Sequence, residues 1–263
     1  MNAPLVRRSP AHRAVVVGSL DLTPRMRRVT VRADSMIDAD LRPAQDVELL
    51  LRQESGRRVK RRYTIRTARP ELGELDLDVL LHGSGPGSRW GADAQPGDEV
   101  EFQGPRGKLE LRPAPFHLLV GDESALPAIA AIAEALPDGE ASTAVVEVRS
   151  AEDELPVRGD VRWVHRGSTD AGGSELLDAA VRAAIGSTGG GRADAPQAGA
   201  PRADGPGADG LPAGARAYLM GESRAMVALR AVVESLGVEH DAIFVKGYWN
   251  IGRPDRLAGR APA

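Results

Sequence analysis

"PAPFHLLVGDESALPAIAAIAEAL", residues 113–136, is the stretch at which the hydrophobic pattern of the chain changes. Residues 116–120 form a continuous apolar run, which is typical of a strand buried on both faces. Over 126–136, apolar side chains recur at helical spacing, and Pro127 suits the first helical turn. Ser124 can cap this helix. A buried strand followed at once by a helix predicts an α/β half that begins here.

Downstream of this stretch, apolar strands alternate with helices. We expect strands over 144–148, 161–165, 217–220 and 242–245, and helices over 174–185 and 224–236, the second closed by Gly237. This alternation predicts a parallel sheet covered by helices on both faces. Residues 186–214 interrupt it, and Leu211 is the only large apolar residue among them. Such a segment buries too little apolar surface to offset its ordering entropy, so we expect a disordered surface insert.

Upstream of residue 113, apolar and polar residues alternate. Val47, Leu49 and Leu51 repeat at every second position, and Asp76 and Asp78 separate apolar residues in the same way. Period two indicates antiparallel strands with one buried and one exposed face. Turn signals separate the strands at 22–24, 54–56, 73, 96–98 and 104–107. Several short strands at this spacing predict a small closed barrel.

The composition restricts the function. The chain of 263 residues has a net charge of −3, which argues against a nucleic-acid-binding domain, and no cysteine, which excludes disulfides, thiolate catalysis and iron–sulfur clusters. The five histidines show no metal-ligand spacing, so we expect no bound structural metal. No stretch reaches the ~20 apolar residues that cross a bilayer, and the N-terminus lacks a signal-peptide apolar region. We therefore expect a cytoplasmic protein without membrane insertion. We also expect a monomer.

Beside Tyr63, positive charge concentrates in one run: Arg57, Arg58, Lys60, Arg61 and Arg62. Because the chain as a whole is not basic, this run is a local feature. It fits a solvated edge strand, a nucleic-acid patch or a pocket for a phosphorylated aromatic cofactor. The run alone does not decide among these three.

Five short motifs follow one another along the chain: RRYTIR at 61–66, LHG with GPGSRW at 81–90, GDESALPAI at 121–129, GES at 221–223 and GYW at 247–249. With these motifs the chain resembles the siderophore-interacting, FAD-binding ferric reductases, a branch of the ferredoxin-reductase-like superfamily. The resemblance implies an antiparallel FAD-binding β-barrel over 12–113, followed by a Rossmann-like, parallel-sheet NAD(P)H-binding domain over 116–252. It also implies FAD as cofactor, NADPH or NADH as electron donor and a ferric siderophore as acceptor.

In the barrel half, the resemblance implies a set of cofactor-binding residues: Arg61, Tyr63, Thr64, Ile65, Arg66, His82, Gly83, Gly87, Ser88 and Trp90. Tyr63 would lie against the isoalloxazine, and Thr64 would hydrogen-bond the ring or the ribityl chain. Arg61 and Arg66 would serve FAD, with Arg66 placed on the pyrophosphate, which a guanidinium binds bidentately. The direction of Arg66 relative to Thr64 depends on whether a bulge interrupts the strand.

GPGSRW reads as the start of a short helix, whose N-terminal N–H groups attract phosphate, and Ser88 adds a hydroxyl donor. Taken by itself, this segment fits a glycine-rich hairpin turn equally well. Likewise, Tyr63 alone fits a half-buried strand tyrosine, and His82 alone fits a polar surface residue.

In the second half, the resemblance implies cofactor contacts from Asp122, Ser124 and Trp249, and contacts to the nicotinamide nucleotide from Arg149, Ser150, Gly221 and Glu222. Ser124 would bond the flavin or position the nicotinamide, although a plain helix cap explains it equally well. Arg149 and Ser150 would take a 2′-phosphate and so favour NADPH, with Arg224 as a further candidate. Trp249 would cover the far flavin face or line the acceptor pocket. GDES is not G-x-G-x-x-G, so the strict dinucleotide fingerprint is missing.

A rim of Lys60, Arg62, Lys246 and Arg253 would attract an anionic ferric siderophore, although a solvated hairpin end accounts for the first two as well. The family commonly continues GYW with a basic residue, where Asn250 stands here. Because the cofactor carries the redox chemistry, we expect no catalytic side chain and no metal ligand. Two alternatives stay open: a flavin-dependent reductase with another acceptor, and a flavin- or siderophore-binding module that does not turn over.

Overall fold

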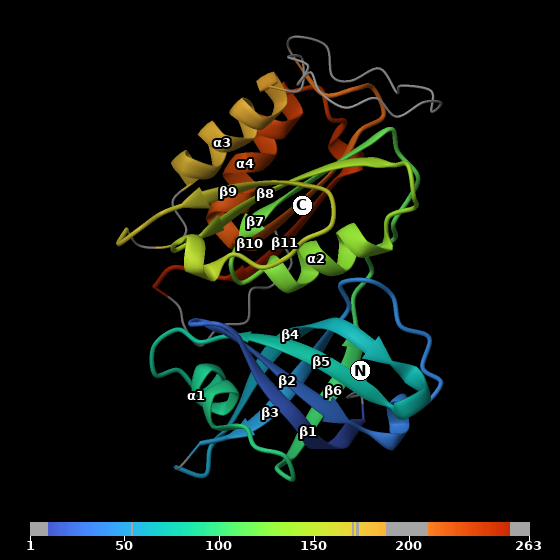
Figure 1. Cartoon of the computed structure of the whole chain (residues 1–263), viewed down its shortest axis with the longest axis vertical. Coiled ribbons are helices and arrows are strands. Elements are labelled where there is room, and N and C mark those ends of the chain that lie inside the picture. Colours follow the sequence, from blue (N-terminus) through green and yellow to red (C-terminus); the bar gives the residue numbers. More distant parts are fainter. Residues whose placement is uncertain (1–9, 54, 170, 172–173, 188–209, 253–263) are drawn as a thin grey trace, which may run out of the picture. The chain divides into compact units, whose positions relative to one another are not determined.

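A computed structural model describes residues 10–53, 55–169, 171, 174–187 and 210–252 (Figure 1). The chain divides into two compact units, Met1–Leu109 and Glu110–Ala263, and each has its own hydrophobic core. Within the described ranges, every helix is too short or too polar to cross a membrane.

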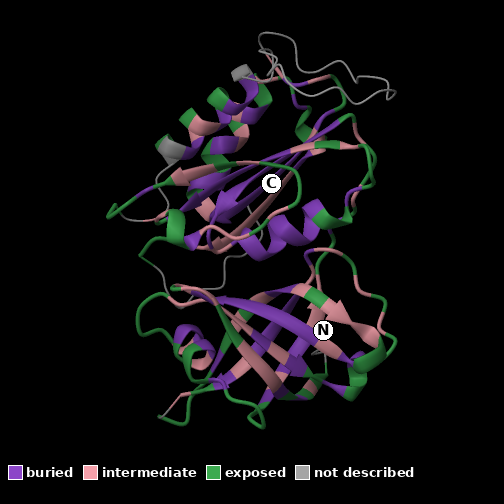
Figure 2. Ribbon diagram, viewed as in Figure 1, coloured by how far each residue is buried: buried purple, intermediate pink, exposed green. Residues whose placement is uncertain are grey.

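The first unit is a closed antiparallel barrel, which confirms the prediction from the alternating pattern. Its strands are β1 (Ala11–Thr23), β2 (Met26–Arg32), β3 (Asp46–Arg52), β4 (Arg58–Arg69), β5 (Glu74–Leu80) and β6 (Glu99–Arg106), which pair in the order β1-β2-β5-β4-β3-β6. Alternate apolar side chains, such as Val47, Leu49 and Leu77, fill the buried interior. Figure 2 colours the ribbon of these strands by the burial of each residue. Helix α1 (Pro86–Asp93) follows β5, and the short turns η1 (Asp34–Met36) and η2 (Pro70–Leu72) follow β2 and β4.

One expectation for the barrel is wrong, and one alternative stays open. The basic residues from Arg58 to Arg62 lie at the start of β4, where they pair with β3 alone, and β5 joins β4 only from Ile65 onward, so a solvated strand edge still fits them. Gly104 and its neighbours belong to the end of β6 and not to a separate turn. Gly104 has a φ of 126°, and a Cβ there would lie 3.0 Å from the backbone oxygen of Asp46. Close strand pairing therefore requires a glycine at this position. In the sequence, such a glycine looks the same as a glycine in a turn.

The second unit is a parallel sheet covered on both faces, as predicted. Its strands are β7 (Phe116–Asp122), β8 (Ala141–Val148), β9 (Asp160–His165), β10 (Arg216–Glu222) and β11 (Ile243–Trp249), in the order β11-β10-β7-β8-β9. Helices α3 (Ser174–Ser187) and α4 (Ser223–Ser235) cover one face and α2 (Leu126–Ala135) covers the other (Figure 1). Short turns η3 (Ala151–Asp153) and η4 (His240–Ala242) follow β8 and α4. The order reverses around β7, the arrangement in which ligands bind beyond the carboxyl ends of the strands.

The predicted insert, 186–214, is too long at both ends. Helix α3 continues to Ser187, and Leu211 is 8% exposed and packs in the core with Leu177 and Val233. The one large apolar residue of the segment thus belongs to the folded unit. Residues 188–209 lie outside the described ranges.

Candidate functional site

The first turn of α1, in the barrel unit, is the first candidate anion site. Gly85 is the N-cap residue, and no side chain among the described residues caps the helix. Pro86 has no N–H, which leaves the N–H groups of Gly87 and Ser88 at the helix N-terminus. Such groups carry the positive end of the helix dipole and bind phosphate or carboxylate. The hydroxyl of Ser88, which is largely buried, belongs to the same turn.

Arg61 and Tyr63 of β4 lie against this turn. A Cβ on Gly87 would collide with the Tyr63 hydroxyl and would lie 3.3 Å from Cγ of Arg61. The Tyr63 ring also contacts Trp90 of α1, with 5.8 Å between the ring centroids. Burial raises the pKa of the Tyr63 hydroxyl, although the charge of Arg61 opposes this, so the phenol stays neutral. The aliphatic part of Arg61, a neutral phenol and a helix N-terminus therefore meet at one place, while the Arg61 guanidinium donates to the backbone oxygen of Lys60 at 2.9 Å.

The pairing of β4 becomes irregular just after this point. The register of β4 on β5 shifts between Ile65 and Thr67, which is the irregularity that the direction of Arg66 depends on. The Ile65 side chain lies in the barrel core, so a ligand could meet only its backbone, and Thr64 is 4% exposed. The Arg66 guanidinium donates to the Thr67 hydroxyl at 3.3 Å. His82 and Gly83 are exposed between β5 and α1, and Gly83 has a φ of 61°.

Other bases of the run surround a buried carboxylate. Glu48 is 2% exposed, and its Oε2 accepts a hydrogen bond from Lys60 at 2.6 Å. Arg62 lies 3.6 Å and Arg106 lies 3.4 Å from this carboxylate. Burial works to raise the Glu48 pKa, but Lys60 and the two arginines outweigh it and hold the pKa below its usual range. Lys60 and Arg62 therefore have a structural partner, and their role on a siderophore rim stays a prediction.

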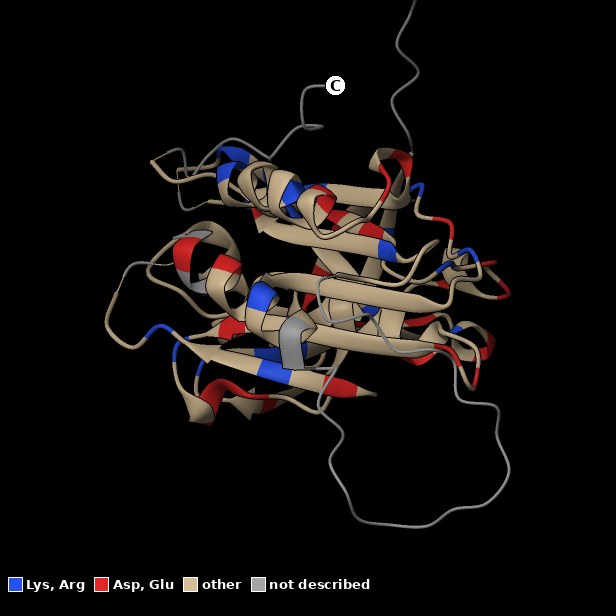
Figure 3. Ribbon diagram, turned by 90° about the horizontal axis from the view of Figure 1, so that it is seen from above, with Lys and Arg blue, Asp and Glu red and all other residues tan. Residues whose placement is uncertain are grey.

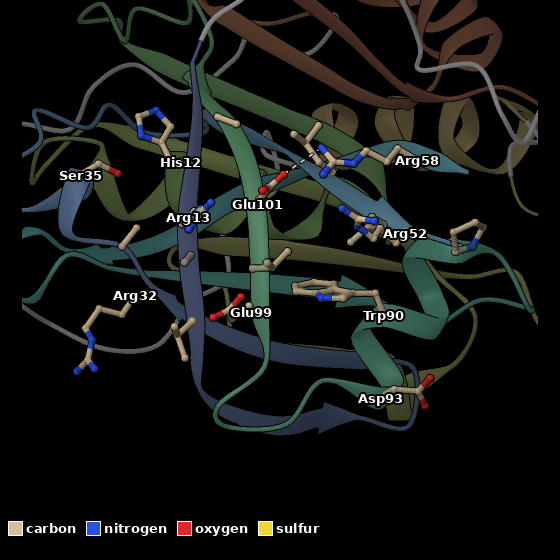
Figure 4. A pocket seen from close by; sticks show the side chains of 18 of the residues that line it. His12, Arg13, Arg32, Ser35, Arg52, Arg58, Trp90, Asp93, Glu99 and Glu101 are labelled. Carbon is tan, nitrogen blue, oxygen red and sulfur yellow. Dashed lines mark hydrogen bonds and ion pairs between the residues drawn. The ribbon is translucent and has the colours of Figure 1, made fainter. Parts of the chain in front are cut away.

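The barrel unit also contains a hollow of about 1070 Å³ beside α1, which the sequence analysis missed (Figure 4). Trp90 forms part of its wall, and Arg58 in the same wall is bonded to Glu101 at 3.1 Å (Figure 4). Its lining carries arginine, aspartate and glutamate side chains together, so its charge favours no one class of ligand. No sequence motif predicts this hollow, because its presence depends on where α1 packs.

In the second unit, Asp122 joins three of the motifs. It ends β7 and is 2% exposed. Its Oδ1 accepts from the N–H and the hydroxyl of Ser124, at 2.9 and 2.5 Å. Its Oδ2 accepts from the backbone N–H of Glu222 at 2.8 Å and from Nε1–H of Trp249 at 2.9 Å. The expectation that Ser124 caps α2 is wrong, because its hydroxyl is bonded to Asp122 and the N-cap residue is Ala125.

The N-terminus of α4 is filled by a carboxylate of the protein. Glu222 is 1% exposed and is the N-cap residue. Its Oε2 accepts from the N–H groups of Arg224 and Ala225, at 2.7 and 2.8 Å, and its Oε1 accepts from Ile251 N–H at 3.2 Å. The carboxylate stands where an external anion would bind, so contact of this side chain with a nucleotide would require these bonds to break.

A buried ion pair lies at the same end of the sheet. Arg166, directly after β9, bonds Glu123 at 2.7 Å and lies 3.8 Å from Glu147. Burial works to lower the Arg166 pKa, but the bonds and charges of the carboxylates outweigh it, and the pKa is raised. Sequence analysis missed this group, because an arginine after a strand end resembles a solvated residue. Figure 3 shows how acidic and basic residues spread over the chain.

The remaining candidates lie at this end of the sheet or outside the described ranges. Arg149, after β8, and Arg224, in the first turn of α4, are exposed. The Ser150 hydroxyl donates to Asp153 at 3.2 Å. Lys246 of β11 lies over the Tyr248 ring, 5.0 Å from its centroid. Arg253 falls outside the described residues, so its role stays a prediction.

Comparison with known proteins identifies the family. Residues 114–252 match the model of siderophore-interacting proteins, and residues 50–109 match that of the siderophore-interacting FAD-binding domain. The chain belongs to the siderophore-interacting protein family. This confirms the resemblance that the five motifs carry.

Three proteins illustrate what this chain is similar to. Ferric vibriobactin reductase ViuB of Vibrio cholerae is 31% identical over 205 residues, 74% of this chain and 66% of the relative, so the chain spans just under two thirds of that protein. The NADPH-dependent ferric-chelate reductase of Escherichia coli is 42% identical over 57 residues, 21% of this chain and 22% of the relative. The crystal structure of a siderophore utilization protein from T. fusca is 27% identical, with a TM-score of 0.73, and covers 92% of this chain and 94% of that one.

Proposed function

We propose that this siderophore-interacting protein is an NAD(P)H-dependent, FAD-containing reductase of ferric siderophores. The observation that carries the proposal is the first turn of α1, where uncapped N–H groups meet Arg61 and Tyr63. Backbone donors and a guanidinium both bind a diphosphate, and an aromatic ring suits the flavin beside it. The match of residues 50–109 to an FAD-binding domain and the names of two relatives, a ferric and a ferric-chelate reductase, support it.

The residues of the barrel unit fit FAD. Gly87 and Ser88 would donate backbone N–H groups to the diphosphate, Arg61 and Arg66 would neutralise its charge, and Tyr63 would hold the ring plane and exclude water. Bound FAD supplies the redox chemistry, because it accepts two electrons from a nicotinamide and releases them singly to iron. The protein therefore needs to bind and orient, and requires no acid, base or nucleophile of its own.

We expect the nicotinamide nucleotide to be bound differently. The Glu222 carboxylate would compete with the phosphates of the donor at the N-terminus of α4, so we expect exposed side chains to bind them. Arg149 and Arg224 are exposed at this end of the sheet and suit that role. A guanidinium that binds a 2′-phosphate would favour NADPH over NADH.

The acceptor is a ferric chelate in this proposal. Fe(III) is held tightly by hard oxygen ligands and Fe(II) more weakly, so reduction of the chelate releases the metal. Lys60, Arg62, Lys246 and Arg253 are the basic residues proposed to attract the anionic chelate. The pairing of the first two with Glu48 reduces their contribution.

An anaerobic absorbance titration tests the proposal. The purified chain is expected to retain added FAD, to lose the flavin absorbance when NADPH or NADH is added, and to recover it when a ferric siderophore follows. Flavin that neither nucleotide bleaches would instead favour a binding module. Flavin that bleaches but is not reoxidised by ferric siderophores would favour another acceptor. A chain that takes up no FAD would refute the proposal.

A further inference from the structure

The carboxylate of Asp122 connects segments that are far apart in the sequence. Its bonds reach Ser124 after β7, Glu222 at the end of β10 and Trp249 at the end of β11. All three segments lie at the carboxyl edge of the sheet, where ligands bind in folds of this kind. The side chain is nonetheless 2% exposed, so its bonds are made to the protein and not to solvent.

The arrangement requires a carboxylate. Each oxygen of Asp122 faces two donors of the described structure, and an ionised carboxylate accepts at both oxygens. An amide of the same shape accepts at one oxygen only, so its NH2 group would oppose either the Ser124 donors or those of Glu222 and Trp249. Burial raises the Asp122 pKa, while the bonds from Ser124 and Trp249 act in the opposite direction and favour the charged form.

Neighbouring residues are adapted to this carboxylate. Gly221 has no side chain, and a Cβ there would collide with Asp122 Oδ2. This is the oxygen that accepts the hydrogen bond from Trp249. The Ser223 hydroxyl donates to the backbone oxygen of Trp249 at 3.0 Å. The indole and the backbone of Trp249 are therefore both fixed, while the residue keeps part of its surface exposed.

We propose that Asp122 is a positioning residue that fixes the Trp249 indole as a stacking surface for the planar heteroaromatic ring of a bound nucleotide. The ring belongs either to the nicotinamide nucleotide or to the flavin, since both have the required chemistry. The identity of the ligand in this proposal rests on the proposed function. The bond between Asp122 and Trp249 is independent of that function. Asp122 acts through Trp249 and touches no reacting atom.

The first test needs no cofactor. In the ¹H–¹⁵N spectrum of the full chain, which has three tryptophans, Trp249→Phe identifies the Trp249 indole signal. In the unchanged chain, we expect this signal to lie downfield and its N–H to be protected from exchange. In Asp122→Asn, we expect the signal to move upfield and the N–H to exchange about tenfold faster, because one charge-assisted bond is lost. The control is Glu140→Gln, the same chemical change on the partner of His117 at the other end of β7.

A Trp249 signal in the unchanged chain that is neither downfield nor protected would overturn the proposal, even if Asp122→Asn does not fold. A signal that Asp122→Asn leaves in place would overturn it as well. Movement of the signal in Glu140→Gln to the same extent would show a general loosening of the sheet and would also count against Asp122.

The second test measures dissociation constants for FAD, NADPH and NADH. Asp122→Asn is expected to weaken the ligand whose ring meets Trp249 by roughly 2- to 10-fold, the range for one aromatic contact. A loss for FAD alone identifies the flavin, and a loss for the nicotinamide nucleotides alone identifies those. In a Trp249→Phe background, Asp122→Asn should add no further loss, and an equal loss there would overturn the proposal. If the unchanged chain binds none of them, the proposed function fails and the stacking role with it, while the spectrum still decides whether Asp122 fixes the indole.

Discussion

Arg61 and Arg62 are adjacent on β4 and offer a matched pair of substitutions. Arg61 lies against the first turn of α1, with its Cγ 3.3 Å from the position of a Cβ on Gly87. Arg62 projects from the opposite face of the strand, 3.6 Å from the Glu48 carboxylate. Arg61→Ala and Arg62→Ala remove the same charge from the same strand, but only the first removes a group beside the proposed diphosphate site.

The expected magnitude follows from these contacts. A charge-assisted hydrogen bond contributes about 1.5–3 kcal/mol, so Arg61→Ala should raise the dissociation constant of FAD roughly 10- to 150-fold. Arg62→Ala leaves Glu48 with Lys60 at 2.6 Å and Arg106 at 3.4 Å. Its effect on FAD is a distant, screened charge effect and should stay within about threefold.

Quenching of flavin fluorescence on titration into the apoprotein measures both constants. Repeating it at several salt concentrations separates the direct contact from the screened effect, because only the second falls steeply with salt. Circular dichroism of both variants checks that the barrel is folded. Equal losses in the two variants would refute the placement of the diphosphate at α1, and a larger loss in Arg62→Ala would move the site to the other face of β4.

Three further predictions concern single residues. Gly87→Ala forces a Cβ into the Tyr63 hydroxyl, which costs about 1–3 kcal/mol of overpacking, and should weaken FAD binding. Gly85→Ala, where a Cβ would meet nothing within 4 Å, should leave FAD binding unchanged, and equal effects of the two substitutions on FAD binding would contradict this packing. Burial works to raise the Asp76 pKa, but Arg69 and Thr30 hold it below the usual value. The stability it adds is thus present above about pH 4 and lost as the pH falls through the folded-state pKa. Asp76→Asn should lower the free energy of barrel unfolding in urea by about 3 kcal/mol at pH 7 and flatten its decline in acid, and an unchanged acid slope would count against it. Arg149→Ala should raise the KM for NADPH about tenfold and leave that for NADH within about twofold in steady-state assays; parallel changes would exclude a 2′-phosphate contact.

The sequence predicts the strands of the barrel well, because one side of each strand is buried. Val47, Leu49 and Leu77 are completely buried, and the polar residues between them face outward or pair across strands. Prediction fails where a side chain has two possible partners. The pattern makes Ser124 a helix cap, yet the buried carboxylate two residues earlier takes its hydroxyl. It also assigns Leu211 to a disordered insert, because nothing local shows that the core of the second unit has a place for it.

The two helix N-termini show why function could be read only partly from motifs. GPGSRW and GESRAM both place a glycine before a helix at the end of a strand, and both suggest an anion site by the same reasoning. The difference lies in the N-cap residue, since Gly85 offers no acceptor while Glu222 turns its carboxylate back onto the N–H groups of Arg224 and Ala225. A diphosphate would have to displace that buried carboxylate at α4, whereas at α1 it would cap a turn that has no side-chain cap, with the aliphatic part of Arg61 nearby. Under the proposed function, the flavin would be bound by backbone donors at α1, and the nicotinamide nucleotide would be bound by exposed arginines.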